Sequence, residues 1–468
     1  MNKNFRCTGI CANCGRCKGA NMMQKANERK TKLLTFPEDF VPNKGNNGFG
    51  IAFDIGTTTV VGVLWDLVKG EQVGTMAKTN PQNAYGSDVI SRITYCGGKE
   101  DKIEELRNKV IDCLNQILDT LCKNHSIDSS QIVKAAVCGN TTMSHIFAGY
   151  DPMSLALAPF IPAYKGEVIM SGEEARLKID PSAKVFLIPN IAGHVGGDIN
   201  AGIIASRLLN KKELTLFIDI GTNGEIVLTK DSMTLTCSTA AGPAFEGASI
   251  KDGMRAASGA IERIEIREDD VFFKTIDGCE PVGICGFGLI DAVAQMLKVQ
   301  LINKKGRLAS AEEYLKKHPE SNLGYRLRND EEGNREFVLV FKEGKEDVVI
   351  TQKDVREVQL AKGAISAGIQ IMLEELGEKL DNIKKVMIAG AFGNFIDKES
   401  AIAIGLIPSV QLSKIHLVGN TAGSGTCMVL VSEEDENLSV NISDDVKHIE
   451  LASCNNFQER YLKAMQFI

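Results

Sequence analysis

Four cysteines lie within eleven residues of one another near the N-terminus of this 468-residue chain, with the spacing C-x3-C-x2-C-x2-C. Four thiolates that converge on one point are expected to bind a metal. Structural zinc sites usually pair two separated knuckles, whereas one contiguous loop with such short steps is typical of iron–sulfur ligation. The spacing therefore favours an iron–sulfur cluster, [4Fe-4S] before [2Fe-2S], with zinc as the alternative. The candidate ligands are Cys7, Cys11, Cys14 and Cys17.

The other nine cysteines are scattered singly, which argues against a disulfide framework. We expect most of them to be buried as small hydrophobic side chains. Cys279 and Cys285 could form a redox-active pair, but their spacing of six and their apolar surroundings favour burial.

Two short turns carry a second kind of chemistry. Asp54 opens the sequence D-I-G-T-T-T after an apolar run, and Asp219 opens D-I-G-T-N-G 165 positions later. Glycine lets backbone N–H groups approach phosphate oxygens, threonine and asparagine side chains add donors, and a carboxylate at a strand end can bind Mg²⁺. One such turn also occurs in ordinary hairpins, but an internal repeat favours nucleotide binding. We predict phosphate contacts from Gly56, Thr57, Thr58, Gly221, Thr222 and Asn223.

Two further segments fit the same scheme. Asp198 follows two glycines at the start of a helical run, where it could orient Mg²⁺ or an attacking water, or simply cap the helix. The strand-like residues 383–388 lead into A-G-A-F-G, which predicts close backbone approach to adenosine, or else tight packing of a helix on a sheet. Residues 133–142 are the counterpart in the first half, which need not bind nucleotide. The residues predicted to border adenosine are Gly390, Ala391, Phe392 and Gly393.

The elements that would position these residues are short strands and helices. Apolar runs at 49–53 and 60–65 predict a hairpin around the first turn, and runs at 214–218 and 225–228 predict one around the second. We therefore expect an α/β fold with two related lobes.

The predicted organisation has four parts. Residues 1–20 would form the Cys-rich segment, and 21–47 would form a polar linker, either a mobile tether or an extension packed on the body. The two lobes would span 48–208 and 209–468, the second with a charged surface insertion near 304–346.

Composition excludes several classes of protein. With 44% hydrophobic and 24% charged residues, the chain can bury a large core and is not intrinsically disordered. No run approaches the roughly 20 apolar residues of a membrane-spanning helix, and a secretory signal is missing, so we expect a cytoplasmic protein. Residues 1–33 carry a net charge of +7, which leaves −14 on the rest. An acidic body with one Trp argues against a nucleic-acid-binding surface.

The repeated D-I-G-T turns and the A-G-A-F-G turn resemble those of the actin, sugar-kinase and Hsp70 ATPase superfamily. This resemblance implies a duplicated RNase-H-like fold, whose two lobes clamp Mg-ATP in the cleft between them. Asp54 and Asp219 stand where the superfamily places carboxylates near metal and phosphates, and with Asp198 they are the catalytic candidates.

More narrowly, four strings resemble the reductive activators of corrinoid proteins. They are N-A-Y-G-S-D-V-I-S-R-I at 83–93, I-A-G-H-V-G-G-D at 191–198, T-A-A-G-P-A-F-E-G at 239–247 and I-T-Q-K-D-V-R at 350–356, within a resemblance that covers 48–460. It implies an ATPase that drives an electron from an iron–sulfur centre onto an inactive Co(II) corrinoid and restores Co(I). The better-known members carry a whole [2Fe-2S] ferredoxin domain, or a C-terminal pair of clusters, where this chain has a short cysteine loop.

The leading expectation is therefore an ATP-hydrolysing reductive activase of an anaerobe. Its partner would be a corrinoid protein or another low-potential metalloprotein. Its electron donor would be a protein such as ferredoxin. A homodimer is one of the assemblies expected. The alternatives are a small-molecule kinase and a scaffold ATPase whose conformation is switched by its nucleotide, each with a structural zinc site in the N-terminal Cys-rich segment. His194 as a cobalt ligand or proton donor, and Glu246 as a ribose or partner contact, are roles that the sequence leaves open.

Overall fold

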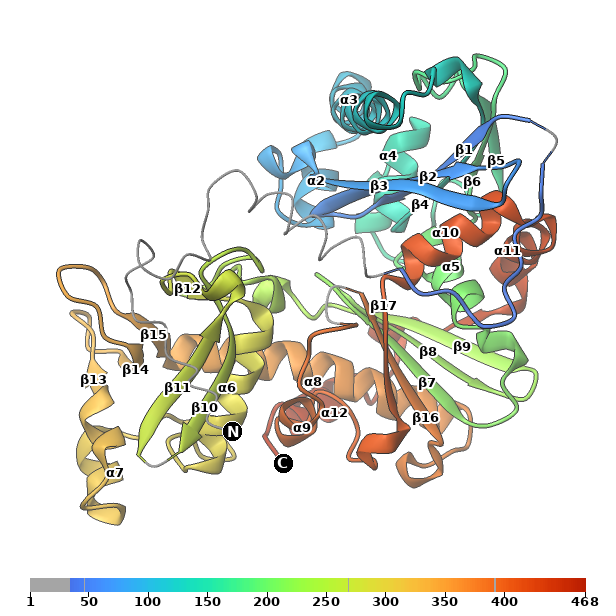
Figure 1. Ribbon diagram of the computed structural model, residues 1–468. Helices are drawn as coiled ribbons and strands as arrows, with labels where there is room; N and C mark the ends of the chain where they lie inside the picture. The colour runs from blue at the N-terminus through green and yellow to red at the C-terminus, as the bar shows by residue number, and fades with distance from the viewer. Residues whose placement is uncertain (1–33, 46, 268, 391–392) are drawn as a thin grey trace.

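The structure is a computed structural model that describes residues 34–45, 47–267, 269–390 and 393–468. The four clustered cysteines, and with them the predicted cluster, lie outside the described residues. Two six-stranded sheets form the centres of two lobes, with helices packed between them (Figure 1).

The first lobe has the strand order β3-β2-β1-β4-β6-β5. Strands β1 to β3 are antiparallel neighbours, whereas β4 runs parallel to β1 and β6 parallel to β4. The strands are β1 (Phe49–Ile55), β2 (Thr59–Asp66), β3 (Glu71–Thr79), β4 (Ile132–Gly139), β5 (Val168–Ser171) and β6 (Lys184–Leu187). The helices are α2 (Val89–Cys96), α3 (Glu100–His125) and α4 (Thr141–Ala148).

The second lobe repeats this arrangement in the order β17-β16-β7-β8-β9-β18. Three antiparallel strands are again extended by two parallel ones, because β16 runs parallel to β7 and β17 parallel to β16. The strands are β7 (Thr215–Ile220), β8 (Gly224–Lys230), β9 (Met233–Thr239), β16 (Lys385–Gly390), β17 (Ile415–Gly419) and β18 (Lys447–His448). The helices are α8 (Gln352–Glu375), α9 (Lys398–Ala403) and α12 (Phe457–Ala464). The predicted α/β class is confirmed.

A large insertion stands between β9 and α8 and extends one side of the molecule in Figure 1. It holds two three-stranded sheets, β11-β10-β12 and β13-β14-β15. The elements are β10 (Ala260–Arg267), β11 (Asp270–Thr275), β12 (Gly283–Ile284), α6 (Gly286–Lys298), α7 (Ala311–Lys317), β13 (Leu327–Asn329), β14 (Arg335–Val340) and β15 (Val348–Thr351). The charged segment 304–346 contains α7, β13 and β14, and β14 is buried at Phe337, Val338 and Leu339.

Two helices form a middle layer between the sheets: α5 (Gly197–Ala205) and α10 (Thr421–Val431). Side chains alternate across a strand, so Phe53 on β1 packs toward α3 while Ala52 joins the middle layer, as Phe217 does from β7. Both helices are apolar nearly all round, as expected of helices buried on every side. They cross closely, since a Cβ at Gly425 would lie 1.9 Å from the Ala201 carbonyl oxygen.

The end of the predicted linker is packed on the body in the described part. The Thr35 N–H donates to the Ser424 hydroxyl of α10 at 3.0 Å, and Phe36 packs edge-on against Trp65 with 5.9 Å between the ring centres. Residues 34–45 therefore form an extension anchored beside α10, a helix of the C-terminal half that continues into α11 (Glu433–Asp445).

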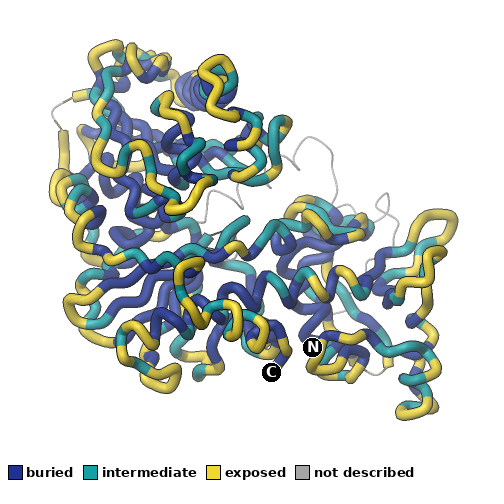
Figure 2. Tube along the Cα trace, turned by 180° about the vertical axis from the view of Figure 1, so that it is seen from behind, coloured by how far each residue is buried: buried dark blue, intermediate teal, exposed yellow. Residues whose placement is uncertain are grey.

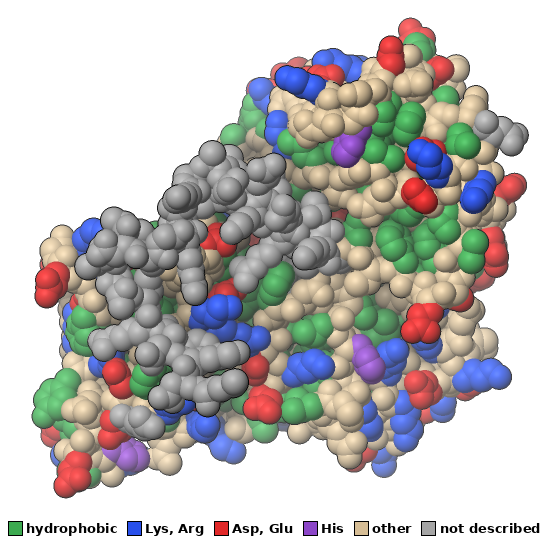
Figure 3. Space-filling model, in the orientation of Figure 1, with side chains coloured by type: hydrophobic (Ala, Val, Ile, Leu, Met, Phe, Trp, Pro, Cys, Tyr) green, Lys and Arg blue, Asp and Glu red, His purple; other side chains and the backbone are tan. Residues whose placement is uncertain are grey.

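Burial follows the layers, with strands and central helices buried and connecting loops exposed (Figure 2). On the face drawn in Figure 3, acidic and basic side chains are interspersed. Of the nine single cysteines, seven are buried, as predicted, and Cys279 and Cys454 are partly buried. Within the described ranges, no helix combines the length and apolar character needed to cross a membrane.

Candidate functional site

A cavity of about 380 Å³ opens between the two lobes. Both predicted phosphate turns reach its wall, one from the β1–β2 connection and one from the β7–β8 connection. The fold thus joins in one site two segments that are 165 positions apart in the chain. The predicted site residues that line it are Asp54, Gly56, Thr57, Thr58, Asp198, Asp219, Gly221, Thr222, Asn223 and Gly390.

The first turn is held from behind by a buried arginine. The Arg92 guanidinium, which is 0% exposed, donates from Nη2 to the carbonyl oxygen of Thr57 at 2.6 Å. Asn140, the N-cap of α4, donates from Nδ2 to Thr57 Oγ1 at 2.9 Å. Burial lowers the pKa of Arg92 to about 10, so the group stays charged at neutral pH. The turn is therefore fixed, with a positive charge behind it.

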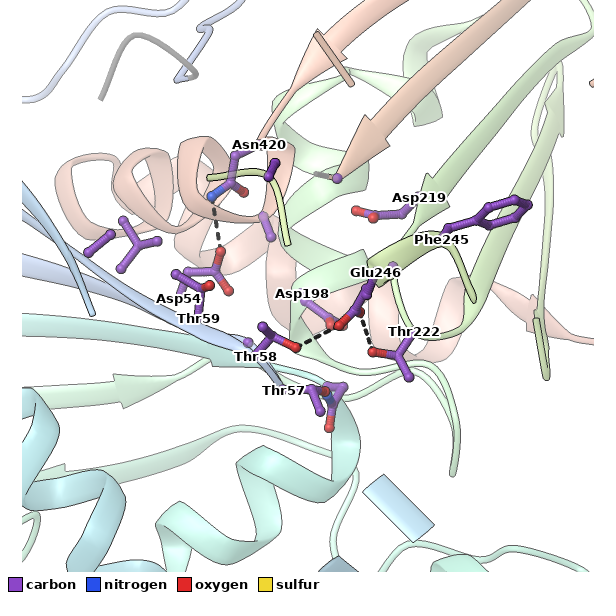
Figure 4. A pocket seen from close by; sticks show the side chains of 18 of the residues that line it. Asp54, Thr57, Thr58, Thr59, Asp198, Asp219, Thr222, Phe245, Glu246 and Asn420 are labelled. Atoms are coloured by element: carbon purple, nitrogen blue, oxygen red, sulfur yellow. Dashed lines mark hydrogen bonds between the residues drawn. The ribbon is translucent and has the colours of Figure 1, made fainter. Parts of the chain in front are cut away.

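The second turn is closed by its own backbone and reaches the first through one carboxylate. The Gly221 N–H donates to the Asn223 carbonyl oxygen at 2.9 Å. The Thr222 hydroxyl donates to one oxygen of Glu246, and the Thr58 hydroxyl donates to the other at 2.7 Å. Figure 4 shows Glu246 between the two threonines.

Asp54 stands at the end of β1, where the strand meets the first turn. Asn420, the N-cap of α10, donates from Nδ2 to Asp54 Oδ2 at 3.1 Å, and the Cys138 thiol lies 3.7 Å from Oδ1. Desolvation raises the pKa of Asp54, although these two hydrogen bonds oppose the shift. A cation beside Asp54 would offset the cost of burying its negative charge.

Asp198 and Asp219 enter the same cavity from α5 and β7 (Figure 4). Asp198 is the second residue of α5, whose N-cap is Gly196, and its Oδ1 accepts the Ile199 N–H at 2.8 Å, so it satisfies a donor of the helix start as well as lining the cavity. Burial, followed by the charge of neighbouring aspartates, raises the pKa of Asp198 to about 7 and that of Asp219 to about 8. The pKa of Glu225 on β8 is also raised, by burial first and then by the charges of Asp198 and Asp219. Buried carboxylates that raise one another's pKa values mark this cavity as a candidate functional site.

Gly390 makes room for one of these carboxylates. A Cβ at Gly390 would lie 2.2 Å from Asp219 Oδ1, and its φ of +77° is a conformation that favours glycine. Gly393 does not line the cavity and packs against the backbone of Gly419 instead, where a Cβ would lie 2.7 Å from the nitrogen. Ala391 and Phe392 lie outside the described residues.

The arrangement suits a cation that arrives with its ligand. In the described part of the chain, no group of three or more His, Cys, Asp or Glu side chains is arranged to hold a metal ion by itself. Mg²⁺ typically keeps several waters and binds through one or two carboxylates together with substrate phosphates. The cavity supplies such carboxylates beside hydroxyl and backbone donors that suit phosphate oxygens.

The chain matches two family models that together span the body. Residues 49–211 match the RACo middle region, and residues 213–468 match the C-terminal domain of RACo, the ASKHA domain. A solved structure described as a reductive activator for corrinoid, iron–sulfur protein superposes with a TM-score of 0.79 at 40% identity, covering 91% of this chain and 67% of that one. The chain belongs to the RACo family of reductive activators of corrinoid proteins.

Curated relatives of this RACo chain are similar over nearly its whole length. The corrinoid activation enzyme RamQ of Eubacterium limosum is 39% identical over 435 residues, which cover 92% of this chain and 72% of the relative. The [Co(II) methylated amine-specific corrinoid protein] reductase of Methanosarcina barkeri is 27% identical, covering 90% of this chain and 77% of the relative. The predicted resemblance is confirmed.

Some residues of the RACo site were not assigned from sequence. Arg92 lies in the N-A-Y-G-S-D-V-I-S-R-I string, yet its contact with Thr57 depends on how α2 packs. Asn420 carries no motif signal beyond an N-cap before a helical run. Glu246 has a definite place between the two turns, while His194 lies outside the cavity lining, against Phe160 with 5.0 Å between ring centres.

Proposed function

We propose that the protein is an ATP-dependent reductive activator that returns a corrinoid protein partner from Co(II) to Co(I). The observation that carries the proposal is the meeting of two matching phosphate turns and three aspartates in one interlobe cavity of a RACo chain. The names of its relatives supply the corrinoid partner.

The cavity would bind Mg-ATP with residues from both lobes. The hydroxyls of Thr57, Thr58 and Thr222 suit the phosphate oxygens, and Gly390, which lines the cavity, would border adenosine. Asp54 and Asp219 would hold Mg²⁺ directly or through water, and the cation would offset the burial that raises the pKa of both carboxyl groups. Mg²⁺ would supply charge stabilisation for the phosphates.

Hydrolysis would use Asp198. Its carboxylate enters the cavity from the first turn of α5, beside the carboxylates assigned to the metal. Burial raises its pKa to about 7, close to the range in which a carboxyl group can accept a proton from water at neutral pH. We assign Asp198 the orientation of the attacking water.

The electron would come from the N-terminal segment. Cys7, Cys11, Cys14 and Cys17 would hold an iron–sulfur cluster, with [4Fe-4S] favoured by their spacing. A cluster held by these residues would supply one-electron chemistry for the reduction of Co(II) to Co(I), with a low-potential protein such as ferredoxin as the electron donor. No proton or group is transferred in that step.

The nucleotide would act by changing which arrangement of the lobes is favoured. Each ~59 mV of uphill one-electron transfer costs a factor of ten, so ATP must stabilise one state of the complex over another. The middle layer of α5 and α10 touches both sheets, and α10 also anchors Thr35 at the end of the segment from the cysteines. A change in lobe closure would therefore reach Thr35, which lies near the start of the described residues.

Metal analysis and spectroscopy test this proposal. Anaerobically purified protein is expected to contain about four iron and four acid-labile sulfide per chain, and dithionite should bleach its visible spectrum. Zinc without iron would overturn the electron-transfer role. ATP consumption that depends on an added sugar would favour a small-molecule kinase instead.

A further inference from the structure

Glu246 occupies a distinctive place between the two lobes. Its carboxylate accepts hydrogen bonds from Thr58 on the first turn, at 2.7 Å, and from Thr222 on the second. It belongs to the short 3-10 helix Pro243–Glu246, which precedes the inserted sheets. One side chain therefore connects both phosphate turns across the cavity (Figure 4).

The backbone that presents Glu246 is firmly held. The preceding residue, Phe245, is 2% exposed and belongs to the core of the second lobe. The turn ends at Gly247, where a Cβ would lie 2.5 Å from the Met254 carbonyl oxygen. Because this backbone is packed on both sides, the Glu246 side chain must itself rotate if it is to leave the threonines.

The contacts of Glu246 are those that a phosphate would need. A carboxylate is an acceptor-only group with a negative charge, as a terminal phosphate is, and hydroxyl donors serve both. Thr58 and Thr222 are among the donors assigned above to the phosphates. Glu246 and a terminal phosphate therefore compete for the same two hydroxyls, and their like charges oppose joint occupation.

We propose that Glu246 is a specificity-determining residue, a carboxylate stand-in for the terminal phosphate that lets the cavity distinguish nucleoside triphosphate from diphosphate. The inference rests on the proposed function, because it needs Mg-ATP to bind in this cavity. A triphosphate must displace Glu246 from both threonines. A diphosphate leaves both hydrogen bonds of Glu246, to Thr58 and to Thr222, in place. The two lobes then remain connected in the same way as in the nucleotide-free protein.

The test compares affinities for a non-hydrolysable ATP analogue and for ADP, both with Mg²⁺, by isothermal titration calorimetry. Glu246→Ala removes two charge-assisted hydrogen bonds that compete with phosphate. We therefore expect the Kd for the ATP analogue to fall by about tenfold or more. The Kd for ADP should stay within about threefold of the native value. Glu246→Gln, which keeps the shape of the side chain and removes its charge, should shift the analogue in the same direction.

The matched control is Glu265→Gln, an exposed carboxylate on β10 that does not line the cavity and should leave both affinities unchanged. An equal change for both nucleotides, no change, or weaker analogue binding in Glu246→Ala and Glu246→Gln overturns the inference while leaving the proposed function intact. Failure of the native protein to bind either nucleotide overturns both.

Discussion

Asn420 donates a hydrogen bond of 3.1 Å from Nδ2 to Oδ2 of Asp54, although the two residues lie 366 positions apart in the chain. The same Asn420 side chain caps α10, because its Oδ1 accepts from the Gly423 N–H at 2.8 Å. The start of a helix from the C-terminal half is thus tied to the carboxylate that ends the first strand of the fold. This contact places the start of α10 beside the carboxylate that we assign to Mg²⁺ in the proposed function.

Replacing Asp54 should weaken nucleotide binding through the metal. Asp54→Asn removes the charge assigned to Mg²⁺ but keeps the size of the side chain, so Mg-ATP affinity is expected to fall about tenfold or more. Calorimetric titrations with Mg²⁺ and with EDTA check this, since the loss should appear only with Mg²⁺. Asp231→Asn, at the exposed β8–β9 turn, is the control. An equal loss without Mg²⁺ would contradict the metal role.

Gly390 should tolerate no side chain. Gly390→Ala would place a Cβ 2.2 Å from Asp219 Oδ1 at a φ of +77°, so it should both displace that carboxylate and destabilise the fold by about 1–3 kcal/mol. Gly377→Ala is a matched control, because Gly377 has a φ of +68° but open space around its Cβ position. Nucleotide titration and urea unfolding separate the two effects. If both variants bind Mg-ATP equally well, the contact with Asp219 is unimportant for the site.

Arg92 should position the first turn. It donates to Thr57 O at 2.6 Å, to Asn83 Oδ1 at 2.7 Å and to Gly86 O at 3.0 Å. Arg92→Met leaves these acceptors without donors, and the free energy of unfolding should fall by about 2–4 kcal/mol, with weaker nucleotide binding.

Urea unfolding of Arg92→Met is best compared with that of Arg356→Met, an exposed position on α8 that should change stability by less than about 0.5 kcal/mol. Equal losses in the two variants would show that the network around Thr57 contributes little to stability.

His145 should make stability depend on pH. Its Nδ1 bonds the Thr141 carbonyl at 2.7 Å and its Nε2 accepts from the Ala163 N–H at 2.9 Å, so the buried ring is neutral, and burial lowers its pKa to about 4. The unfolded chain, with a His pKa near 6.5, therefore binds a proton first as the pH falls. The stability contributed by His145 is present above about pH 6.5, decreases below it, and is about 2 kcal/mol smaller at pH 5.

Urea unfolding at pH 7 and pH 5 measures this contribution as the difference between the native protein and His145→Gln. The exposed His125→Gln should keep the native pH dependence. A native-like loss of stability between pH 7 and 5 in His145→Gln would contradict the assignment.

The sequence was sufficient to predict the strands that flank both phosphate turns, because repeated D-I-G-T turns between apolar runs are local signals. The predicted turn residues do line one cavity, but their role in binding nucleotide stays a prediction. Asn420 and Arg92 could not be assigned, since their contacts depend on how α10 and α2 pack against distant turns. Asp198 shows the limit of pattern alone, because a capping residue and a cavity carboxylate look identical at a helix start.

The most direct test is the rate at which Co(I) absorbance appears when the anaerobic, reduced protein is mixed with a methyltransferase corrinoid protein in the Co(II) state. The rate is compared with Mg-ATP, with Mg-ADP and without nucleotide. We expect reduction of Co(II) with Mg-ATP and little reduction without nucleotide. In Asp54→Asn, the effect of ATP should be abolished. Equal rates under all three conditions, or no Co(I) in any of them across a panel of such corrinoid proteins, would contradict an ATP-dependent reductive activator.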